Sequence, residues 1–333
     1  MRELLKRLSD CYGPSGEEAL VREVVRKEIA RSVDEIRTDV MGNLIARRRG
    51  RGRRIMLTAH MDESGIVVTH IDAKGFVRFA AVGSLESETL PGARVILSNG
   101  TRGTIGLEGL GDEKARPTLE KMYLDVGAAD AKSAGGLVSV GDCAVLDGEA
   151  TDLGGRIVGK ALGARVGCAM LIEAAKRVRG AKNDLYFVLA VQGALGGRGV
   201  ITSAYSVDPE IGMAVDVSPT GDTPEGQAAS VQLGKGPAIK VKDAGIVSHP
   251  KVRQLLIDGA RRRGIPYQLE ISDGRTAGGQ AMQATRSGVP TGVISVPCRY
   301  VHTPSEMVDL GDIEGGVRLL LYAMTADMSR LEL

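Results

Sequence analysis

The chain has 333 residues, of which 43% are hydrophobic and 25% are charged, an ordinary composition for a globular protein. This length exceeds what one hydrophobic core usually serves, so we expect two domains. The net charge of +2 gives no electrostatic basis for a nucleic-acid partner, and no uncharged apolar stretch is long enough to span a membrane.

The four cysteines lie far apart without a CxxC spacing, which favours reduced thiols over a disulfide framework. The N-terminal segment is amphipathic and charged and has no signal-peptide core. We therefore expect a cytoplasmic protein.

The N-terminal part is expected to be helical. A short helix begins at Leu4, and apolar residues at helical spacing predict a longer helix over 17–30. Ser15 is a candidate N-cap for it, and Glu18 three residues later would complete a capping box. Two strands around a turn follow, over 32–38 and 42–46.

An arginine-rich segment, Arg47–Arg54, comes next. Such a segment can be a nucleic-acid patch or a solvated hairpin turn. We favour the turn, because no aromatic residues interleave with the arginines and the whole chain is nearly neutral.

An apolar run that begins at Ile55 ends in His60, Asp62 and Glu63. Buried strands are typically short apolar runs bounded by turn residues. Imidazole and carboxylate groups at the end of such a strand can hold a metal, and Asp62 is placed to orient His60. This strand is therefore a candidate for the first part of a metal site.

Short β-like segments without long helices then predict a small β-domain over 67–155. They lie at 67–71, 75–79, 93–97, 103–106, 122–126 and 137–141. Helices and strands alternate afterwards: helices over 165–179, 250–263 and 309–331, and strands over 183–191, 211–217 and 292–296. The β-domain thus interrupts an α/β domain formed by 1–66 and 156–333.

Two further strand ends carry possible ligands, Asp216 and His302. Functional groups of α/β sheets gather at the carboxyl ends of strands, so His60, Asp216 and His302 are expected to converge. The alternative is structural: both histidines would be hydrogen-bonded, to Asp62 and Glu306, and Asp216 would cap the next turn.

Ordered motifs run the length of the chain, at 12–17 (YGPSGE), 39–46 (DVMGNLIA), 59–63 (AHMDE), 159–162 (GKAL), 214–217 (AVDV), 221–224 (GDTP), 234–239 (GKGPAI), 288–291 (GVPT) and 297–306 (PCRYVHTPSE). With them the sequence resembles the M42 family of metallo-aminopeptidases, whose self-compartmentalised tetrahedral members are called TET peptidases. The resemblance implies a zinc-peptidase-like α/β domain, with a mixed sheet flanked by helices, and an inserted PDZ-like β-domain for dimerisation and assembly. It also implies a homo-oligomer, from dimer to dodecamer.

The family's chemistry uses two divalent metals, zinc or cobalt, bridged by an aspartate. By resemblance, one metal would take His60 and Asp216, and the other would take His302 and a glutamate. A neighbouring glutamate is the general base that activates the bridging water.

This chain departs from that pattern at its active-centre carboxylates. Where the family has Asp-Asp it has Gly163 and Ala164, and where the family has Glu-Glu it has Gly193 and Ala194. Ala277 stands where the family usually has an aspartate. The bridging aspartate, the general base and one metal ligand are therefore missing, and no catalytic residue set is intact.

Three interpretations follow. The first is a non-catalytic M42 homologue that assembles, binds peptides or other ligands, or co-assembles with an active paralogue, and holds no metal or one weakly bound divalent metal. The second is a hydrolase with a single metal on His60, Asp216 and His302. The third is an altered form of an active aminopeptidase.

Lys160 and Arg165 flank the vacated centre, and we expect them to pair with surface carboxylates rather than to stabilise an anion.

Overall fold

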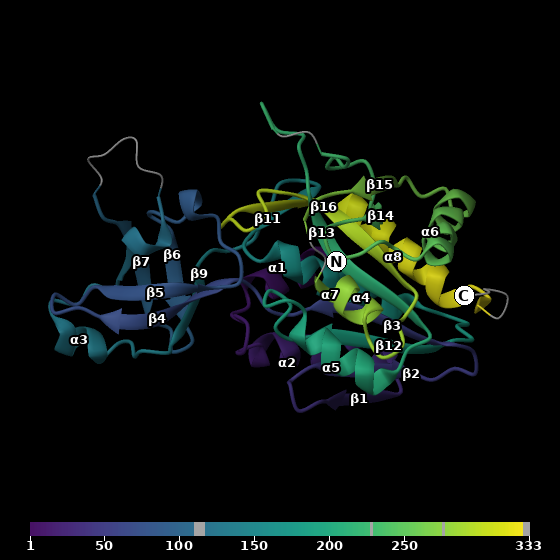
Figure 1. Ribbon diagram of the computed structural model, residues 1–333, viewed down its shortest axis with the longest axis horizontal. Coiled ribbons are helices and arrows are strands. Elements are labelled where there is room, and N and C mark those ends of the chain that lie inside the picture. The colour runs from purple at the N-terminus through teal and green to yellow at the C-terminus, as the bar shows by residue number, and fades with distance from the viewer. Residues whose placement is uncertain (110–116, 227–228, 275–276, 329–333) are drawn as a thin grey trace.

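The computed structural model describes residues 1–109, 117–226, 229–274 and 277–328. Figure 1 shows a large α/β body and a smaller β-body set to one side of it. The smaller body is formed by one internal stretch of the chain. This arrangement confirms the predicted α/β fold with an inserted β-unit.

The α/β body is built on a mixed sheet of 11 strands. Nine follow one another across it: β1 (Glu35–Thr38), β2 (Leu44–Arg48), β12 (Asp184–Ala190), β3 (Arg54–His60), β13 (Ile211–Pro219), β16 (Thr291–Arg299), β17 (Glu306–Asp309), β11 (Arg156–Gly159) and β10 (Thr151–Asp152). The other two are β14 (Ala238–Lys242), which pairs with β16, and β15 (Gln268–Ile271), which pairs with β14. The central strands β12, β3, β13 and β16 are parallel, so their carboxyl ends lie at one edge.

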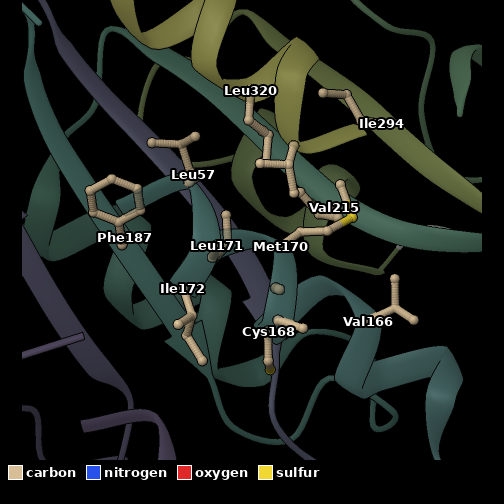
Figure 2. Close-up of a cluster of buried hydrophobic side chains, with 14 of the residues drawn as sticks. Leu57, Val166, Cys168, Met170, Leu171, Ile172, Phe187, Val215, Ile294 and Leu320 are labelled. Atoms are coloured by element: carbon tan, nitrogen blue, oxygen red, sulfur yellow. The ribbon is translucent and has the colours of Figure 1, made fainter. Parts of the chain in front are cut away.

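Helices cover this sheet. They are α1 (Arg2–Asp10), α2 (Ala19–Ile29), α4 (Leu162–Arg177), α5 (Arg198–Val207), α6 (Pro250–Arg262), α7 (Ala277–Gln283) and α8 (Leu310–Thr325), with a 3-10 turn η1 (Ala30–Ser32). Figure 2 shows side chains of α4, among them Met170 and Leu171, packed between the strand residues Leu57 and Val215 and Leu320 of α8. Helix α4 is buried almost all round, which holds its N-terminus firmly at the sheet edge.

The inserted body is a closed antiparallel barrel with its own apolar core. Its strands, in spatial order, are β4 (Gly65–Ile71), β5 (Val77–Val82), β8 (Met122–Asp125), β7 (Arg102–Leu107), β6 (Arg94–Leu97) and β9 (Cys143–Leu146), accompanied by α3 (Ala131–Gly135), η2 (Ser87–Thr89) and η3 (Leu119–Lys121). Closure removes the exposed strand edges that a small sheet would otherwise present. No helix in the described part of the chain is long and apolar enough to cross a membrane.

Several local predictions were wrong. The expected strand over 137–141 is turn, because a capping box between Asp130 and Ser133 starts helix α3 just before it. The last helix ends at Thr325 rather than at residue 331, and 329–331 lie outside the described residues. The sequence patterns also missed the helices α5 and α7.

The expected capping box of α2 is absent, since the helix begins after Glu18 with no side-chain cap. The arginine-rich segment is a turn, but it is not a hairpin, because β12 lies between β2 and β3. Its arginines pair with nearby carboxylates, for example Arg47 with Asp184 at 2.8 Å.

Asp312 near the start of α8 makes the stability of this body depend on pH. Its carboxylate accepts hydrogen bonds from the amide groups of Gly234 (2.7 Å) and Gly236 (2.6 Å). Burial raises the pKa of Asp312 from its ordinary value of 3.8 to about 6. The folded chain thus binds this proton more tightly than the unfolded chain, so the free energy of unfolding falls as pH rises between about 4 and 6.

We expect Asp312→Asn to flatten this slope by about 1–3 kcal/mol over that pH range. Urea unfolding of both proteins at several pH values between about 4 and 7 measures it. Slopes that are the same in the two proteins would contradict the assignment.

Candidate active site

The predicted site residues gather at the carboxyl edge of the parallel strands. His60 ends β3, Asp216 lies in β13, and His302 follows β16. The N-terminal turn of α4 brings Gly163, and the loop after β12 brings Gly193. These five residues line one cavity of about 340 Å³. The convergence expected from strand ends is therefore present in the structure.

Asp62 is the most strongly held side chain of this cavity. It is fully buried and accepts hydrogen bonds from the Ser15 hydroxyl (2.6 Å) and from the amide groups of Gly193 (2.6 Å) and Ala194 (2.9 Å). Its Oδ1 lies 3.2 Å from Nδ1 of His60. Burial alone would raise the pKa of Asp62, but His60 and these donors hold it well below its usual range.

The carboxylates around His60 raise the pKa of its imidazole. Burial lowers the pKa of its imidazole, but Asp62 and then Asp216 outweigh that effect and raise it to about 9. Since the Asp62 carboxylate can only accept, Nδ1 of His60 donates to it. Burial raises the pKa of Asp216, which accepts a hydrogen bond from the amide of Val217 (2.8 Å).

His60 also fills the space beside Gly193. A Cβ atom on Gly193 would lie 2.3 Å from Cβ and 2.4 Å from Cγ of His60, which is far inside van der Waals contact. The loop backbone donates to Asp62 from the same side, so neither partner can retreat easily. A side chain at position 193 therefore requires His60 or the loop to move.

We expect Gly193→Ala to destabilise the protein by about 1–3 kcal/mol, as overpacking of a closed site does. Gly278→Ala is the matched control, because a Cβ there would meet Thr58 at an ordinary 3.6 Å and alanine favours the helix α7. Urea unfolding of both variants measures the difference. Equal urea midpoints in the two variants would show that the loop at Gly193 moves to admit the methyl group with no loss of stability.

Gly163 is less constrained. Its amide donates to Oε2 of Glu306 (2.7 Å), and a Cβ there would lie 3.3 Å from Oε1. Glu306 also accepts from the backbone amide of His302 (2.8 Å). Burial raises the pKa of Glu306 to about 7. The expected bond between Glu306 and the His302 side chain is thus replaced by one to its backbone, where φ is +67°.

We expected Lys160 and Arg165 to pair with surface carboxylates, and this prediction is wrong. Both bind the buried Glu63: Nζ of Lys160 lies 2.8 Å from Oε2, and Nη2 of Arg165 lies 2.9 Å from Oε1. All three side chains are at most 3% exposed. Ser15 and Glu63 are thus partners that sequence patterns missed, and since their contacts are remote in the chain, no local signal points to them.

The donor set does not fit a divalent metal. Across residues 1–109, 117–226, 229–274 and 277–328, no group of three or more His, Cys, Asp and Glu side chains is arranged to hold one. Nδ1 of His60 is hydrogen-bonded to Asp62, which leaves Nε2 as its one possible ligand atom, and positions 163, 193 and 194 contribute no side-chain donor. We therefore derive no chemical step through a metal.

A mixed sheet with a site at the carboxyl edge of its parallel strands, interrupted by a closed β-barrel, defines an α/β scaffold of the zinc-peptidase type. The model of the M42 glutamyl aminopeptidase family matches residues 42–319. The chain belongs to the M42 family, whose members use divalent metal ions.

Relatives cover almost the whole chain. A protein of Acetivibrio thermocellus with a provisional aminopeptidase name is 44% identical, over 97% of this chain and 98% of its own. The structure of an aminopeptidase from Desulfurococcus kamchatkensis is 35% identical with a TM-score of 0.94, over 98% of this chain and 94% of its own. The TET1 peptidase of Pyrococcus horikoshii, which can assemble into a tetrahedron or a large octahedral shell, is 29% identical with a TM-score of 0.88, over 98% of this chain and 99% of its own.

Proposed function

We propose that this protein is a non-hydrolytic M42 homologue that binds peptides in the cleft where its relatives cleave them. One observation carries the proposal: the cleft has no proton-accepting or metal-bridging side chain at Gly163, Gly193 or Ala194. The packing of His60 against Gly193 supports it, because the space of one lost side chain is already filled.

The cleft still suits a peptide. It is lined by apolar side chains such as Leu85 and Val217 together with polar groups such as Ser84 and Thr303. Ligand sites of proteins combine these two kinds of lining, in which the polar groups fix the orientation of the ligand. The hydrogen bonds that Asp62 accepts from Ser15, Gly193 and Ala194 hold the loop at Gly193 beside this lining.

Aminopeptidase activity is the second candidate, and the names of the relatives favour it. It would need either a single metal on His60, Asp216 and His302 or a general base outside the family's positions. Among the residues that the structure describes, no group of three donors is placed to hold a metal, which counts against the first of these. An altered form of an active aminopeptidase would lack the same carboxylates.

Residues 67–155, which contain most of the barrel, form the assembly module in this proposal. The assemblies of TET1 from Pyrococcus horikoshii support a homo-oligomer, and a catalytically silent chain of this fold is also suited to co-assemble with an active paralogue. Native mass spectrometry of the purified protein reports the size of the assembly.

The proposed function is tested by measuring both the binding and the cleavage of a peptide. A short unblocked peptide is titrated calorimetrically against the metal-supplemented protein, and the mixture is then analysed by mass spectrometry for cleavage products. We expect binding and an intact peptide. Stoichiometric binding followed by cleavage would establish the aminopeptidase, and the absence of binding would leave assembly alone as the function.

A further inference from the structure

The loop that follows β12 forms one wall of the cleft. Gly193, Ala194 and Gly196 line the cavity, and none of them carries a side chain larger than a methyl group. This wall therefore meets a ligand mainly with its backbone, whose shape is set by its dihedral angles. Ala194 also lies against the barrel, since a Cβ on Gly83 would be 3.0 Å from the Cβ of Ala194. A shift of the loop would thus change the cleft where the two bodies meet.

Four successive backbone amides of this loop donate to buried side chains. The amide of Val191 donates to Oδ1 of Asn43 (2.9 Å). The amide of Gln192 donates to Oε1 of Glu18 (2.9 Å), and the next two amides donate to Asp62. The three acceptor residues are at most 3% exposed. Each of the four loop residues is therefore held by a side chain from outside the loop.

Gln192 is the strained residue of the four. Its φ of +52° lies in the left-handed region, which is unfavourable for residues other than glycine. Such a conformation persists only where the surrounding structure holds it. Oε1 of Glu18 accepts from Gln192 and also from the amide of Gly16 (2.9 Å), which joins the loop to the segment before α2. Glu18 does not itself line the cavity, so it can affect a ligand only through the loop.

We propose that Glu18 is a positioning residue for peptide binding. It holds Gln192 in the left-handed conformation, which keeps the wall at Gly193 in the shape that the peptide meets. This inference rests on the proposed peptide-binding function and adds a residue outside the cleft on which that function depends. Without this acceptor, Gln192 adopts a negative φ in a share of the molecules. The apparent affinity then falls with the fraction that keeps the binding shape.

Calorimetric titration with the amidated tetrapeptide Ala-Leu-Ala-Ala tests this role. We expect Glu18→Ala to weaken binding about tenfold, as the cost of the left-handed region for a non-glycine residue would provide. Glu18→Gln should bind within about twofold of the unsubstituted protein, because its amide oxygen still accepts both hydrogen bonds. Asp312→Ala is the matched control: Asp312 is also buried and accepts two backbone amides, but it does not line the cavity. It should leave the affinity unchanged.

Gln192→Gly distinguishes positioning from a general loss of stability. Glycine enters the left-handed region without steric cost, so adding Glu18→Ala to this background should weaken binding at most about threefold. Hydrogen exchange gives a second measure that needs no ligand. We expect the amides of 191–194 to exchange at least about tenfold faster in Glu18→Ala than in the unsubstituted protein. Circular dichroism checks that each variant is folded. Glu18→Asp, which withdraws the carboxylate by one methylene, replaces Glu18→Ala if that variant does not fold, and we expect a similar loss.

The outcomes separate this inference from the function on which it rests. If the unsubstituted protein binds the peptide and Glu18→Ala binds it equally well, the positioning role is overturned and the cleft remains a peptide site. An equal loss in Asp312→Ala, or a tenfold loss that persists in the Gln192→Gly background, would also overturn it. If the unsubstituted protein binds no peptide, the proposed function and this inference are both overturned.

Discussion

With zinc or cobalt added, turnover of aminoacyl p-nitroanilides is expected to be at least about 10⁴-fold below that of an M42 relative that retains the carboxylates. General-base catalysis accounts for about 10²–10⁴ in rate, and metal ions contribute several kcal/mol of transition-state stabilisation. Each 1.36 kcal/mol is about tenfold, so losing the base and the metal clamp together removes at least four powers of ten.

The same loss should appear in metal binding. A ligand that binds only the folded chain raises its free energy of unfolding by RT ln(1 + [L]/Kd), and its unfolding temperature rises as a result. We expect zinc, cobalt and chelators to leave the unfolding midpoint unchanged, because no group of three donors in the described part of the chain is placed to hold a metal. Metal-dependent turnover within about a hundredfold of the relative would refute the proposed function.

Returning the carboxylates as Gly163→Asp, Ala164→Asp, Gly193→Glu and Ala194→Glu is the reciprocal experiment. We expect little recovery, because a side chain at position 193 meets His60 at 2.3 Å. Strong recovery would show that His60 and the loop move readily, and that this chain is an altered form of an active aminopeptidase.

Removing the buried carboxylate of Glu63 is expected to cost about 3–5 kcal/mol of stability. Glu63→Ala would leave Lys160 and Arg165 as buried cations without their counter-charge. Breaking a buried ion pair from one side costs this much, because the remaining charge has neither water nor a partner. The lowered midpoint in urea, followed by far-UV circular dichroism, measures the effect.

Glu314→Ala is the control for Glu63→Ala. Glu314 also meets a guanidinium, that of Arg177 at 2.7 Å, but its side chain is 46% exposed. Water screens such a pair, so its loss should cost at most about 1 kcal/mol. Similar losses in the two variants would mean that the buried network contributes no more than a surface pair.

The sequence was most informative for strands whose burial appears as one continuous apolar run. The apolar runs at β3, β12, β13 and β16 predicted buried strands, because a parallel strand is covered on both faces and has few polar positions. The run of short strands predicted the inserted β-unit for a similar reason. The helices α5 and α7 were missed, since β-branched residues and glycines give them weak helical signals.

Part of the candidate site could also be predicted from the sequence. His60, Asp216 and His302 could be predicted to converge because each stands near the end of a central strand, and strand ends meet at one sheet edge. Gly163, Gly193 and Ala194 are equally visible in the sequence, where the resemblance of the surrounding motifs implies that the family has carboxylates at these positions.

The family scaffold and the inserted β-unit could therefore be predicted from the chain alone. The packing of sheet and helices was needed to show that His60 fills the space at Gly193 and that Lys160 and Arg165 bind Glu63. These contacts join residues about 100 or more positions apart. Their distances depend on how sheet and helices pack, so they leave no local pattern in the chain.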